Sequence, residues 1–482
     1  MIRAHRVDDV RAAEAALMAS VPDGALMQRA AAGLAVVCQS LLAERRGTVP
    51  GSRVVLLVGG GDNGGDTLYA GARLAARGAQ VHAVLLSPQR THTGGLAALR
   101  RSGGRTVEGS SALDSVRRAD LVLDGIVGIG GSPGLRAPAT NLVSAAASST
   151  ALVVAVDLPS GVEVDTGRTP LDHVRAGVTV TFGTHKVCHL VDPGSASSGV
   201  VRLVDIGLGP HLPRAAVEAL EDADVAALLA RSMVPGRTDD KYRRGVLGLH
   251  VGDRQYAGAS VLAASAALNG GIGMLRVVGD PVVSAAVRDA CPEAVLADGR
   301  VQAWVAGSGT DPSTAAAVVP RLLDSGVPAV LDAGALGVSR RLRPDVLMTP
   351  HAGELARLLG VRRGDIEADR LGHVRQAAES LDATVLLKGS TTLVATPDGR
   401  VRANHTGTPW LATAGSGDLL AGLAAAFLAA GMEALDAGSV AAHVHGLAGS
   451  MAAAVTGSPS ATDVLAALPR ALLRLRLPES AS

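Results

Sequence analysis

The chain has 482 residues, more than one ordinary hydrophobic core holds, which predicts two or more domains. Hydrophobic residues make up 48% of it and charged residues 18%, a composition typical of folded proteins and not of disordered ones. The formal net charge of +1, from 45 basic and 44 acidic residues, argues against the positive surplus with which proteins bind DNA, RNA or anionic membranes.

The cysteines and the first residues indicate the compartment. Cys38, Cys188 and Cys291 are too few and too scattered for a disulfide framework, which favours a reducing environment. The first residues carry charges throughout and lack the apolar segment of a signal peptide. The apolar run at 419–432 is too short to span a bilayer and predicts a buried helix. We therefore expect a cytoplasmic protein without a membrane span.

The first half of the chain alternates helical and strand-like segments. Two helices are predicted between Asp8 and Arg46. Nearly continuous apolar runs follow, the pattern of strands that helices cover on both faces. They lie at 53–58, 80–86, 119–124 and 151–157, with further β-rich sequence at 178–182 and 199–206. The alternation predicts an α/β fold with a parallel sheet and right-handed crossovers.

The second half repeats this pattern after a polar connection. Gly and Pro residues follow Gly207, and the segment 233–245 is polar and charged, so we place the boundary between 210 and 240. Strand-like runs then occur at 246–252, 274–279, 302–307, 328–333, 345–350, 384–389 and 391–396. Long Ala-rich helices extend from Ala414 to the end. The chain is therefore predicted to hold two α/β domains, with ligands at the carboxyl edges of the sheets.

A glycine-rich turn at 58–67 joins the first of these strands to a helix. Glycines let backbone amides approach an anion, and a helix amino terminus adds partial positive charge. The turn lacks the Lys-Ser/Thr of a P-loop, and a generic strand-to-helix turn is the alternative. Its polar residues are Asp62, Asn63 and Asp66.

Two further strand ends carry oxygen-bearing side chains. Asp124 precedes another glycine-rich loop, and Asp157 is followed by Ser160 and Asp165. A single aspartate at such a position commonly only forms a turn or caps a helix. Three such loops at one sheet edge predict more: Asn63, Asp124 and the Ser160 segment can bind a monovalent cation or orient a polar ligand.

The strings GGDNGGDT, DGIVGIGG and DLPSGVEVDTG, with Thr181-Phe182-Gly183 and Lys186, resemble the NAD(P)H-hydrate epimerases. The resemblance implies that Asn63, Asp124 and Ser160 bind potassium and that Asp157 contacts the hydrated nicotinamide and moves its proton. It also implies a set of substrate-binding residues in two loops. These are Asp62, Asn63, Gly64, Gly65 and Asp66, with Gly128, Ile129, Gly130, Gly131, Ser132, Pro133 and Gly134. The chain departs from the family at Asp62, usually Asn, and at Thr67, usually Gly.

The string TAGSGDLLAGLAAAFLAA begins the last predicted helices at Thr413. Small residues at the helix start let amides converge on phosphate charge, and Asp418 lies in the first turn beside that anion site. A carboxylate there is explained by general-base removal of a hydroxyl proton during phosphoryl transfer. The alternative, stabilisation of the helix amino terminus by Asp418, leaves the preceding glycines unexplained.

This helix start resembles the anion hole of ribokinase-like kinases. With the segments 241–268, 305–310, 330–336, 348–355 and 386–394, it resembles the ADP-dependent NAD(P)H-hydrate dehydratases. The resemblance makes Asp418 the catalytic base and implies magnesium bound with ADP. The residues implied at the nucleotide are Lys388, Gly389, Ser390, Thr391, Thr392 and Gly417. Those implied at the hydrated nicotinamide, beside Asp418, are Ala259, Gly309 and His351.

Together the two resemblances predict a Rossmann-like three-layer epimerase domain at 1–215 and a ribokinase-like dehydratase domain at 222–482. The implied activity is repair of NAD(P)HX: epimerisation of the R and S hydrates, and ADP-driven dehydration of the S form to NAD(P)H, giving AMP and phosphate. The alternative is a ribokinase-like kinase for a small molecule with a non-catalytic amino-terminal binding domain. Ala-rich helices suggest packing of subunits into a homo-oligomer. We expect no nucleic-acid partner.

Overall fold

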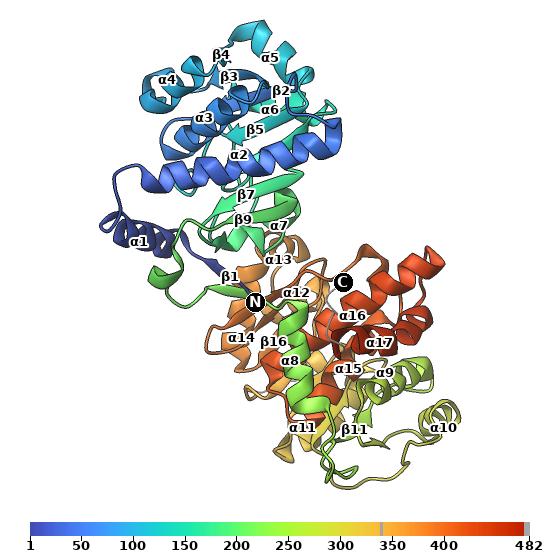
Figure 1. The fold of residues 1–482 in the computed structure, drawn as a ribbon. Coiled ribbons are helices and arrows are strands. Elements are labelled where there is room, and N and C mark those ends of the chain that lie inside the picture. The colour runs from blue at the N-terminus through green and yellow to red at the C-terminus, as the bar shows by residue number, and fades with distance from the viewer. Residues whose placement is uncertain (338–340, 477–482) are drawn as a thin grey trace. The chain divides into compact units, whose positions relative to one another are not determined.

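The computed structural model describes residues 1–337 and 341–476 (Figure 1). The chain forms two compact units. The first comprises Arg3–Val217, and the second comprises Met1–Ile2 and the chain from Glu218 onward. The predicted fold class, two α/β domains, is confirmed, and each unit is described by itself below.

The first unit is built on a seven-stranded sheet in which every neighbouring pair is parallel, as predicted. Its strand order is β4-β3-β2-β5-β6-β7-β9. These strands are β2 (Arg53–Val58), β3 (Gln80–Leu85), β4 (Arg105–Thr106), β5 (Leu121–Gly125), β6 (Leu152–Val156), β7 (Val178–Phe182) and β9 (Val200–Val204). The sequence did not predict β4, nor the pairing of β1 (Ile2–His5) with β8 (His185–Lys186).

Helices cover both faces of this sheet, because its strands are apolar on both sides. In β2, Val54 and Leu56 belong to the core on the face of α2 and α3, whereas Val55 and Leu57 belong to the core on the face of α5 and α6. The helices of the unit are α1 (Val7–Met18), α2 (Ala25–Arg46), α3 (Asp62–Ala75), α4 (Thr93–Arg101), α5 (Gly109–Arg117), α6 (Ala139–Ala147) and α7 (Gly194–Ser198). The unit is thus the predicted three-layer α/β/α fold.

The second unit has a mixed sheet, whereas the sequence predicted a parallel one. The strands are parallel from β12 through β11, β13, β14 and β15 to β16, but β16, β17 and β18 are antiparallel. Only residues 388–391 separate β16 from β17, too few for the helix that a parallel crossover needs. The strands are β10 (Val217–Ala219), β11 (Val246–His250), β12 (Met274–Val277), β13 (Ala303–Ala306), β14 (Ala329–Leu331), β15 (Val346–Met348), β16 (Thr384–Leu387), β17 (Thr392–Ala395) and β18 (Val401–Asn404). The sequence did not predict β10 and β18.

The core of the second unit centres on α15, the predicted buried helix. It packs against α9 and α16 and lies on β13 and β14, and almost every residue after its first turn is buried. The helices are α8 (Asp222–Met233), α9 (Ala257–Gly270), α10 (Pro281–Ala290), α11 (Pro312–Asp324), α12 (Ala352–Leu359), α13 (Arg363–Ala368), α14 (Arg370–Leu381), α15 (Ser416–Ala429), α16 (Ala434–Thr456) and α17 (Ala461–Arg476). Ala, Val and Leu fill this core, as expected of a chain with 1% aromatic residues.

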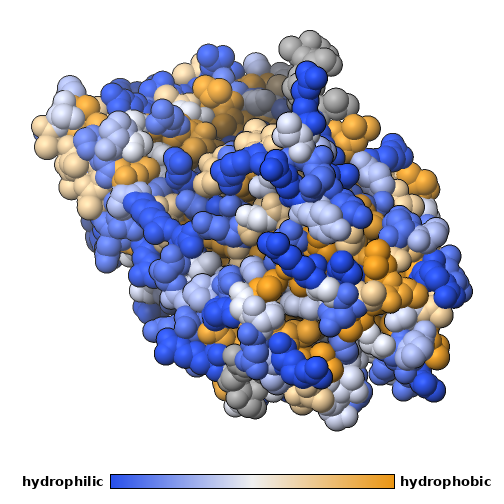
Figure 2. Space-filling model, turned by 90° about the horizontal axis from the view of Figure 1, so that it is seen from below, coloured by the Kyte–Doolittle hydropathy of each residue, from blue (hydrophilic) through white to orange (hydrophobic). Residues whose placement is uncertain are grey.

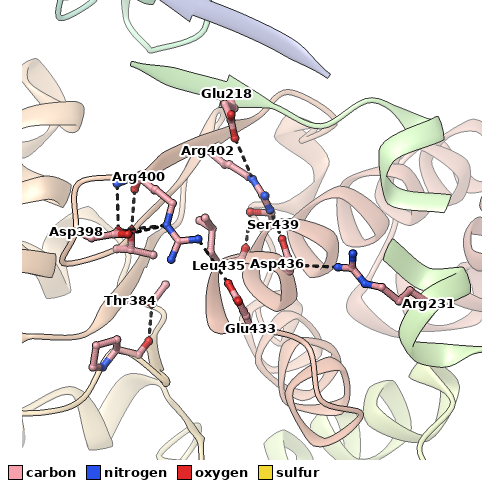
Figure 3. A network of polar contacts seen from close by, with 12 residues as sticks. Glu218, Arg231, Thr384, Asp398, Arg400, Arg402, Glu433, Leu435, Asp436 and Ser439 are labelled. Carbon is pink, nitrogen blue, oxygen red and sulfur yellow. Dashed lines mark hydrogen bonds and ion pairs between the residues drawn. The ribbon is translucent and has the colours of Figure 1, made fainter. Parts of the chain in front are cut away.

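A charged network ties β18 and β10 to the helices α8 and α16 (Figure 3). Arg402 on β18 donates to Asp436 of α16 over 2.6 Å and lies 3.6 Å from Glu218 of β10. Arg231 of α8 approaches the other oxygen of Asp436 at 3.6 Å. Arg402 is largely buried, so this network contributes more to the packing of β18 and β10 against the helices than an exposed ion pair does.

Helix α2 is long and apolar enough to cross a membrane by length and composition alone, which the sequence analysis did not note. A helix of the hydrophobic core of a soluble protein passes the same test. Leu34, Cys38 and Leu42 of α2 are buried in the core on one face of the first sheet.

On the face of the molecule in Figure 2, hydrophilic residues lie interspersed with smaller apolar groups.

Candidate active sites

The first site lies where β2 and β5 end side by side. Gly59 follows β2 and hydrogen-bonds to Gly125, the last residue of β5. A Cβ on Gly59 would overlap the carbonyl oxygen of Ile126, so only glycine fits this crossing. Helix α3 then begins at Asp62, as the glycine-rich turn predicted, and places Asn63 and Asp66 in its first turns. The turn therefore brings its polar residues to the carboxyl edge of the sheet.

The departure at Thr67 is accommodated by the neighbouring strand. The Thr67 hydroxyl donates to the carbonyl oxygen of Asn63 over 2.7 Å, and its side chain is buried. A Cβ added to Gly125 would overlap both the hydroxyl and the Cβ of Thr67. The Thr67 side chain therefore occupies space that is free because residue 125 is glycine. The substitution thus fills a gap between α3 and β5 and does not push the turn away from the site.

Asp124, at the end of β5, is joined to Ser160 across the sheet edge. The Ser160 amide and hydroxyl both donate to the Asp124 carboxylate, over 2.8 and 2.7 Å, and the Val127 amide donates to the Ser160 hydroxyl over 3.1 Å. Burial raises the pKa of Asp124 to about 6, against the hydrogen bonds from Ser160 and Ile126. Within residues 1–337 and 341–476 no ion pair reaches Asp124, so no side chain of the described protein neutralises this buried carboxylate.

Asn63 lies against the loop that follows Asp124. A Cβ on Gly128 would be 3.4 Å from Oδ1 of the Asn63 side chain. The side-chain nitrogen of Asn63, Nδ2, is buried without a hydrogen-bond partner in the described chain. Further along this loop, the Gly134 amide donates to the Gly161 carbonyl over 2.9 Å. The structure therefore brings the three predicted cation ligands and the loop 128–134 to one place.

Asp157 follows β6 and is held by a buried lysine. The Lys186 ammonium contacts Oδ1 of Asp157 at 2.5 Å and also donates to Thr181 and to the Phe182 carbonyl, over 2.9 and 3.1 Å. Asp157 itself adopts a left-handed backbone with φ of 70°, which is strained for a residue with a side chain. In the described chain the hydrogen bonds to its carboxylate reach Oδ1, which leaves Oδ2 for a ligand.

The second site is built at the amino end of α15. Gly415 caps the helix with a left-handed φ of 86°, and Ser416 follows in the first turn. The Ser416 hydroxyl pairs with Nε2 of His445 from α16 at 3.1 Å, and burial, with the nearby Lys388 charge, lowers the pKa of His445 to about 4. His445 is therefore neutral at pH 7, and the helix start is positioned by a partner that the sequence analysis missed.

Asp418 lies in the first turn of α15, as predicted. Burial first, and then the charge of Asp332, raise its pKa to about 6, while Lys388 and a hydrogen bond from Ser308 act in the opposite direction. An added Cβ on Gly417 would be 3.6 Å from the ammonium of Lys388. Asp418, Gly417 and Lys388 thus meet at one site, and a carboxylate of this pKa suits a general base near neutral pH.

Asp332 was not predicted as a site residue, yet it organises the second site. It follows β14 and accepts hydrogen bonds from Lys388 and Thr349 at 2.8 Å and from Ser308 at 2.9 Å. Burial raises its pKa, but Lys388 and the two hydroxyls hold it below the usual value. Burial lowers the pKa of Lys388, and Asp332 and Glu354 raise it above its usual value. The signal was present in the sequence, since Asp332 ends a strand as Asp124 and Asp157 do.

The loop that holds Lys388 to Thr392 joins β16 to β17, as predicted. Arg370, buried at the start of α14, donates to the carbonyls of Lys388 and Thr391 over 3.1 and 3.2 Å. A Cβ on Gly389 would overlap its guanidinium. Arg370 therefore fixes the carbonyls of the loop. Ser390 belongs to the same loop, and Thr392 is the first residue of β17.

The predicted nicotinamide contacts lie on two other elements of this unit. Gly309 packs on α9, where an added Cβ would be 2.7 Å from the Cβ of Ala259. His351 caps α12: its Nδ1 accepts from the amides of Gly353 and Glu354, over 3.0 and 3.1 Å. Glu354 lies 3.7 Å from the Lys388 ammonium, which connects the His351 cap to the Asp332 cluster. In the described part of the chain no three His, Cys, Asp or Glu side chains gather as a metal site.

These two α/β units, each with a polar site at a glycine-rich helix start, define an enzyme with two active sites. Family models agree with that class. The model described as YjeF-related protein N-terminus matches residues 23–188, and the model described as NAD(P)H-hydrate dehydratase matches residues 247–470.

The chain is also similar to curated proteins over most of its length. It is 48% identical over 443 residues to the bifunctional NAD(P)H-hydrate repair enzyme Nnr of Mycobacterium tuberculosis, covering 89% of each chain. To the enzyme of that name from Mycobacterium leprae it is 45% identical over 486 residues, covering 98% of each chain. The chain belongs to the family of bifunctional NAD(P)H-hydrate repair enzymes, which confirms the predicted resemblance.

One solved structure similar to the second unit is the ADP/ATP-dependent NAD(P)H-hydrate dehydratase from Bacillus subtilis, co-crystallised with ATP and Mg²⁺. Its sequence identity to this chain is 28%, and the TM-score is 0.49. The match covers 54% of this chain and 99% of the Bacillus chain.

Proposed function

We propose that the chain repairs hydrated nicotinamide cofactors with two activities, each in one unit. Residues 1–215 interconvert the R and S forms of NAD(P)HX, and residues 222–482 dehydrate the S form at the expense of ADP. Family membership over nearly the whole chain supports the pairing, and the two polar sites supply the chemistry. Within the repair reaction, the observation that carries the dehydratase assignment is Asp418, a half-buried carboxylate with a pKa of about 6 beside Lys388.

In the dehydratase site, Asp418 removes the proton of the 6-hydroxyl as that oxygen attacks the β-phosphorus of ADP. AMP leaves, the N1 lone pair then expels phosphate from C6, and loss of a proton from C5 to water restores the C5=C6 double bond of the nicotinamide ring. Lys388 and the amides at Gly417 face the transferred phosphoryl group, and the loop 388–392 holds the nucleotide. Ala259, Gly309 and His351 line the nicotinamide side. Magnesium is expected to arrive on the phosphates of ADP, because it keeps several waters and binds few protein carboxylates.

In the epimerase site, Asp157 accepts a proton from the hydrated ring, while residues 62–66 and 128–134 hold the rest of the substrate. Potassium fits Asp124, Ser160 and Asn63, because the buried Asp124 carboxylate has no ion-pair partner in the described chain. When bound, potassium supplies the positive charge that this carboxylate lacks. Cytoplasmic localisation and a homo-oligomer stay predictions.

The experiment that tests the two activities uses pure R-hydrate of NADH. With ADP and the intact enzyme, the absorbance of reduced nicotinamide should recover fully, because R is converted to S and S is dehydrated. With the Asp418→Ala variant, R and S should equilibrate without any recovery of absorbance. If R and S equilibrate no faster than in buffer, the first unit is a binding domain and not an epimerase. If pure S-hydrate with ADP gives no NADH, the kinase alternative replaces the dehydratase.

The pH dependence of dehydration follows from Asp418. The base must be ionised, so kcat/KM for the S-hydrate should be constant above the pKa of about 6 and fall about tenfold per pH unit below it. The profile is measured with saturating ADP, between about pH 5 and about pH 8, following NADH absorbance. A profile that stays level through pH 6 would contradict the assignment of Asp418 as the base.

Bound potassium should stabilise the first unit against local unfolding around its site. A ligand at about 100 times its dissociation constant stabilises the state that binds it by about 2.7 kcal/mol. Hydrogen exchange of peptides that cover 121–125 and 152–162 should therefore slow in potassium chloride, compared with tetramethylammonium chloride at equal ionic strength. The Asp124→Asn variant should show no such difference. Equal slowing in wild type and variant would place the ion elsewhere.

A further inference from the structure

Among the buried aspartates of the first site, Asp124 and Asp157 accept hydrogen bonds, whereas Oδ1 of Asp66 has no hydrogen-bond partner in the described chain. Asp66 lies in α3, the residue is 8% exposed, and its Oδ1 is buried without a hydrogen-bond partner among residues 1–337 and 341–476. A buried carboxylate without a partner is costly, whereas a carboxylic acid in the same place carries no charge to stabilise. The isolated oxygen therefore indicates a group whose charged form the fold disfavours.

The charged groups that face Asp66 come from four elements. Asp157 follows β6, Glu14 lies on α1, Asp62 is the first residue of α3, and Lys186 ends β8. Burial is the largest cause that raises the pKa of Asp66 well above its usual value, and the three carboxylates add to it. Lys186 is the one cation among these groups, and it acts in the opposite direction.

Lys186 does not neutralise Asp66, because its donors are used elsewhere. An ammonium group has three N–H donors. In this structure they go to Oδ1 of Asp157, to the Thr181 hydroxyl and to the Phe182 carbonyl. The one buried ammonium thus serves Asp157, while Asp66 has none. Of two carboxyl groups that face the same site, one is therefore ion-paired and the other is not, the asymmetry expected of a base and an acid.

We propose that Asp66 is the proton donor of the epimerase site, opposite Asp157 as the proton acceptor. The proposal rests on the epimerase function proposed above. It adds a catalytic role to a residue that the sequence assigned only to substrate binding. The acid is supplied in the protonated form by the fold, and the base is supplied as an ion-paired carboxylate with Oδ2 open to a ligand.

The 6-hydroxy ring is a carbinolamine, and its inversion needs one acid and one base. Asp157 takes the hydroxyl proton, the oxygen lone pair forms a C6=O double bond, and the C6–N1 bond breaks. Its electron pair goes to N1, which takes the proton of Asp66. Rotation of the aldehyde then exposes its other face, N1 attacks C6, Asp66 regains the proton from N1, and Asp157 returns its proton to the oxygen. No oxidant, reductant or further reactant is consumed.

The test replaces Asp66 with its neutral isostere. Asp66→Asn has the shape and hydrogen-bonding capacity of the protonated acid but cannot donate a proton, so a structural role survives the change and a catalytic role does not. In the Asp418→Ala background, equilibration of R-hydrate should slow by roughly 10²- to 10⁴-fold. Calorimetric binding of R-hydrate should change little. The matched control is Asp114→Asn, an exposed aspartate of α5, which should equilibrate at the wild-type rate.

Three outcomes decide the matter. Slow equilibration with binding retained supports the proposal, and equilibration within about threefold of wild type overturns it, because general acids contribute far more. If the parent with Asp66 intact is also inactive, the epimerase function fails and not the role of Asp66. Should Asp66→Asn not fold, the parent is assayed against pH. The rate must then fall toward high pH as Asp66 loses its proton, and a rate that does not fall at any pH at which the enzyme stays folded would overturn the proposal.

Discussion

Replacing Asp418 with alanine is expected to lower the rate of dehydration by roughly 10²- to 10⁴-fold, the range for loss of a general base. The variant lacks the carboxylate that accepts the hydroxyl proton, while Lys388 and Gly417 keep their places at the phosphates. Binding of ADP should therefore change only a few-fold, and could even tighten, because Asp418 repels the phosphates. Single-turnover assays with the S-hydrate measure the rate, and calorimetric titration measures the binding of ADP.

The isosteric variant Asp418→Asn separates charge from shape. It should be as slow as Asp418→Ala, and it should lose the fall in kcat/KM near pH 6, because no titrating base is left. Equal losses of ADP binding and of turnover in both variants would show that Asp418 stabilises the helix start and does not act as the base.

Replacing Asp332 with alanine is expected to destabilise the second unit by about 3–5 kcal/mol, the cost of leaving one member of a buried ion pair alone. Asp332 is 3% exposed and accepts from Lys388, Thr349 and Ser308. Its removal takes the acceptor from two hydroxyls and leaves the Lys388 ammonium with only the more distant Glu354, 3.7 Å away, as an ion-pair partner. The nucleotide loop should also loosen, since Lys388 loses the contact that positions it.

The chain offers a direct probe of this unit. Its two tryptophans, Trp304 in β13 and Trp410, both lie in the second unit, so denaturant unfolding followed by tryptophan fluorescence reports that unit alone. The double variant Asp332→Ala with Lys388→Met should recover part of the lost stability, because no unpaired charge remains buried. Additive losses in the double variant would contradict a coupled pair.

Strands with apolar residues on both faces could be predicted to within a residue or two, as 53–58 and 178–182 were, because burial on two sides leaves a continuous pattern. Strands β1, β4, β8, β10 and β18 were missed, since they are two to four residues long and include charged or titratable residues. The antiparallel run of β16 to β18 was predictable in principle from the short connections.

The glycine-rich turns and helix starts carry most of the predicted site residues, and the structure places these at two sheet edges. What the sequence could not show is which polar groups pair with one another. Lys186 contacts Asp157 and not Asp66, and Lys388 contacts Asp332, which was overlooked. Which carboxyl group acts as an acid and which as a base depends on those pairings. The sequence alone does not show them, and the folded structure does.

The contact of Thr67 with Gly125 has a consequence for how such sequences diverge. The space between α3 and β5 at these two positions holds one side chain. If residue 67 carries a side chain, residue 125 must be glycine. A change from glycine to threonine at 67 is tolerated only where 125 is already glycine, and a larger residue at 125 closes that path. The two positions are therefore expected to covary, and the order in which they mutate is constrained by space rather than by chemistry.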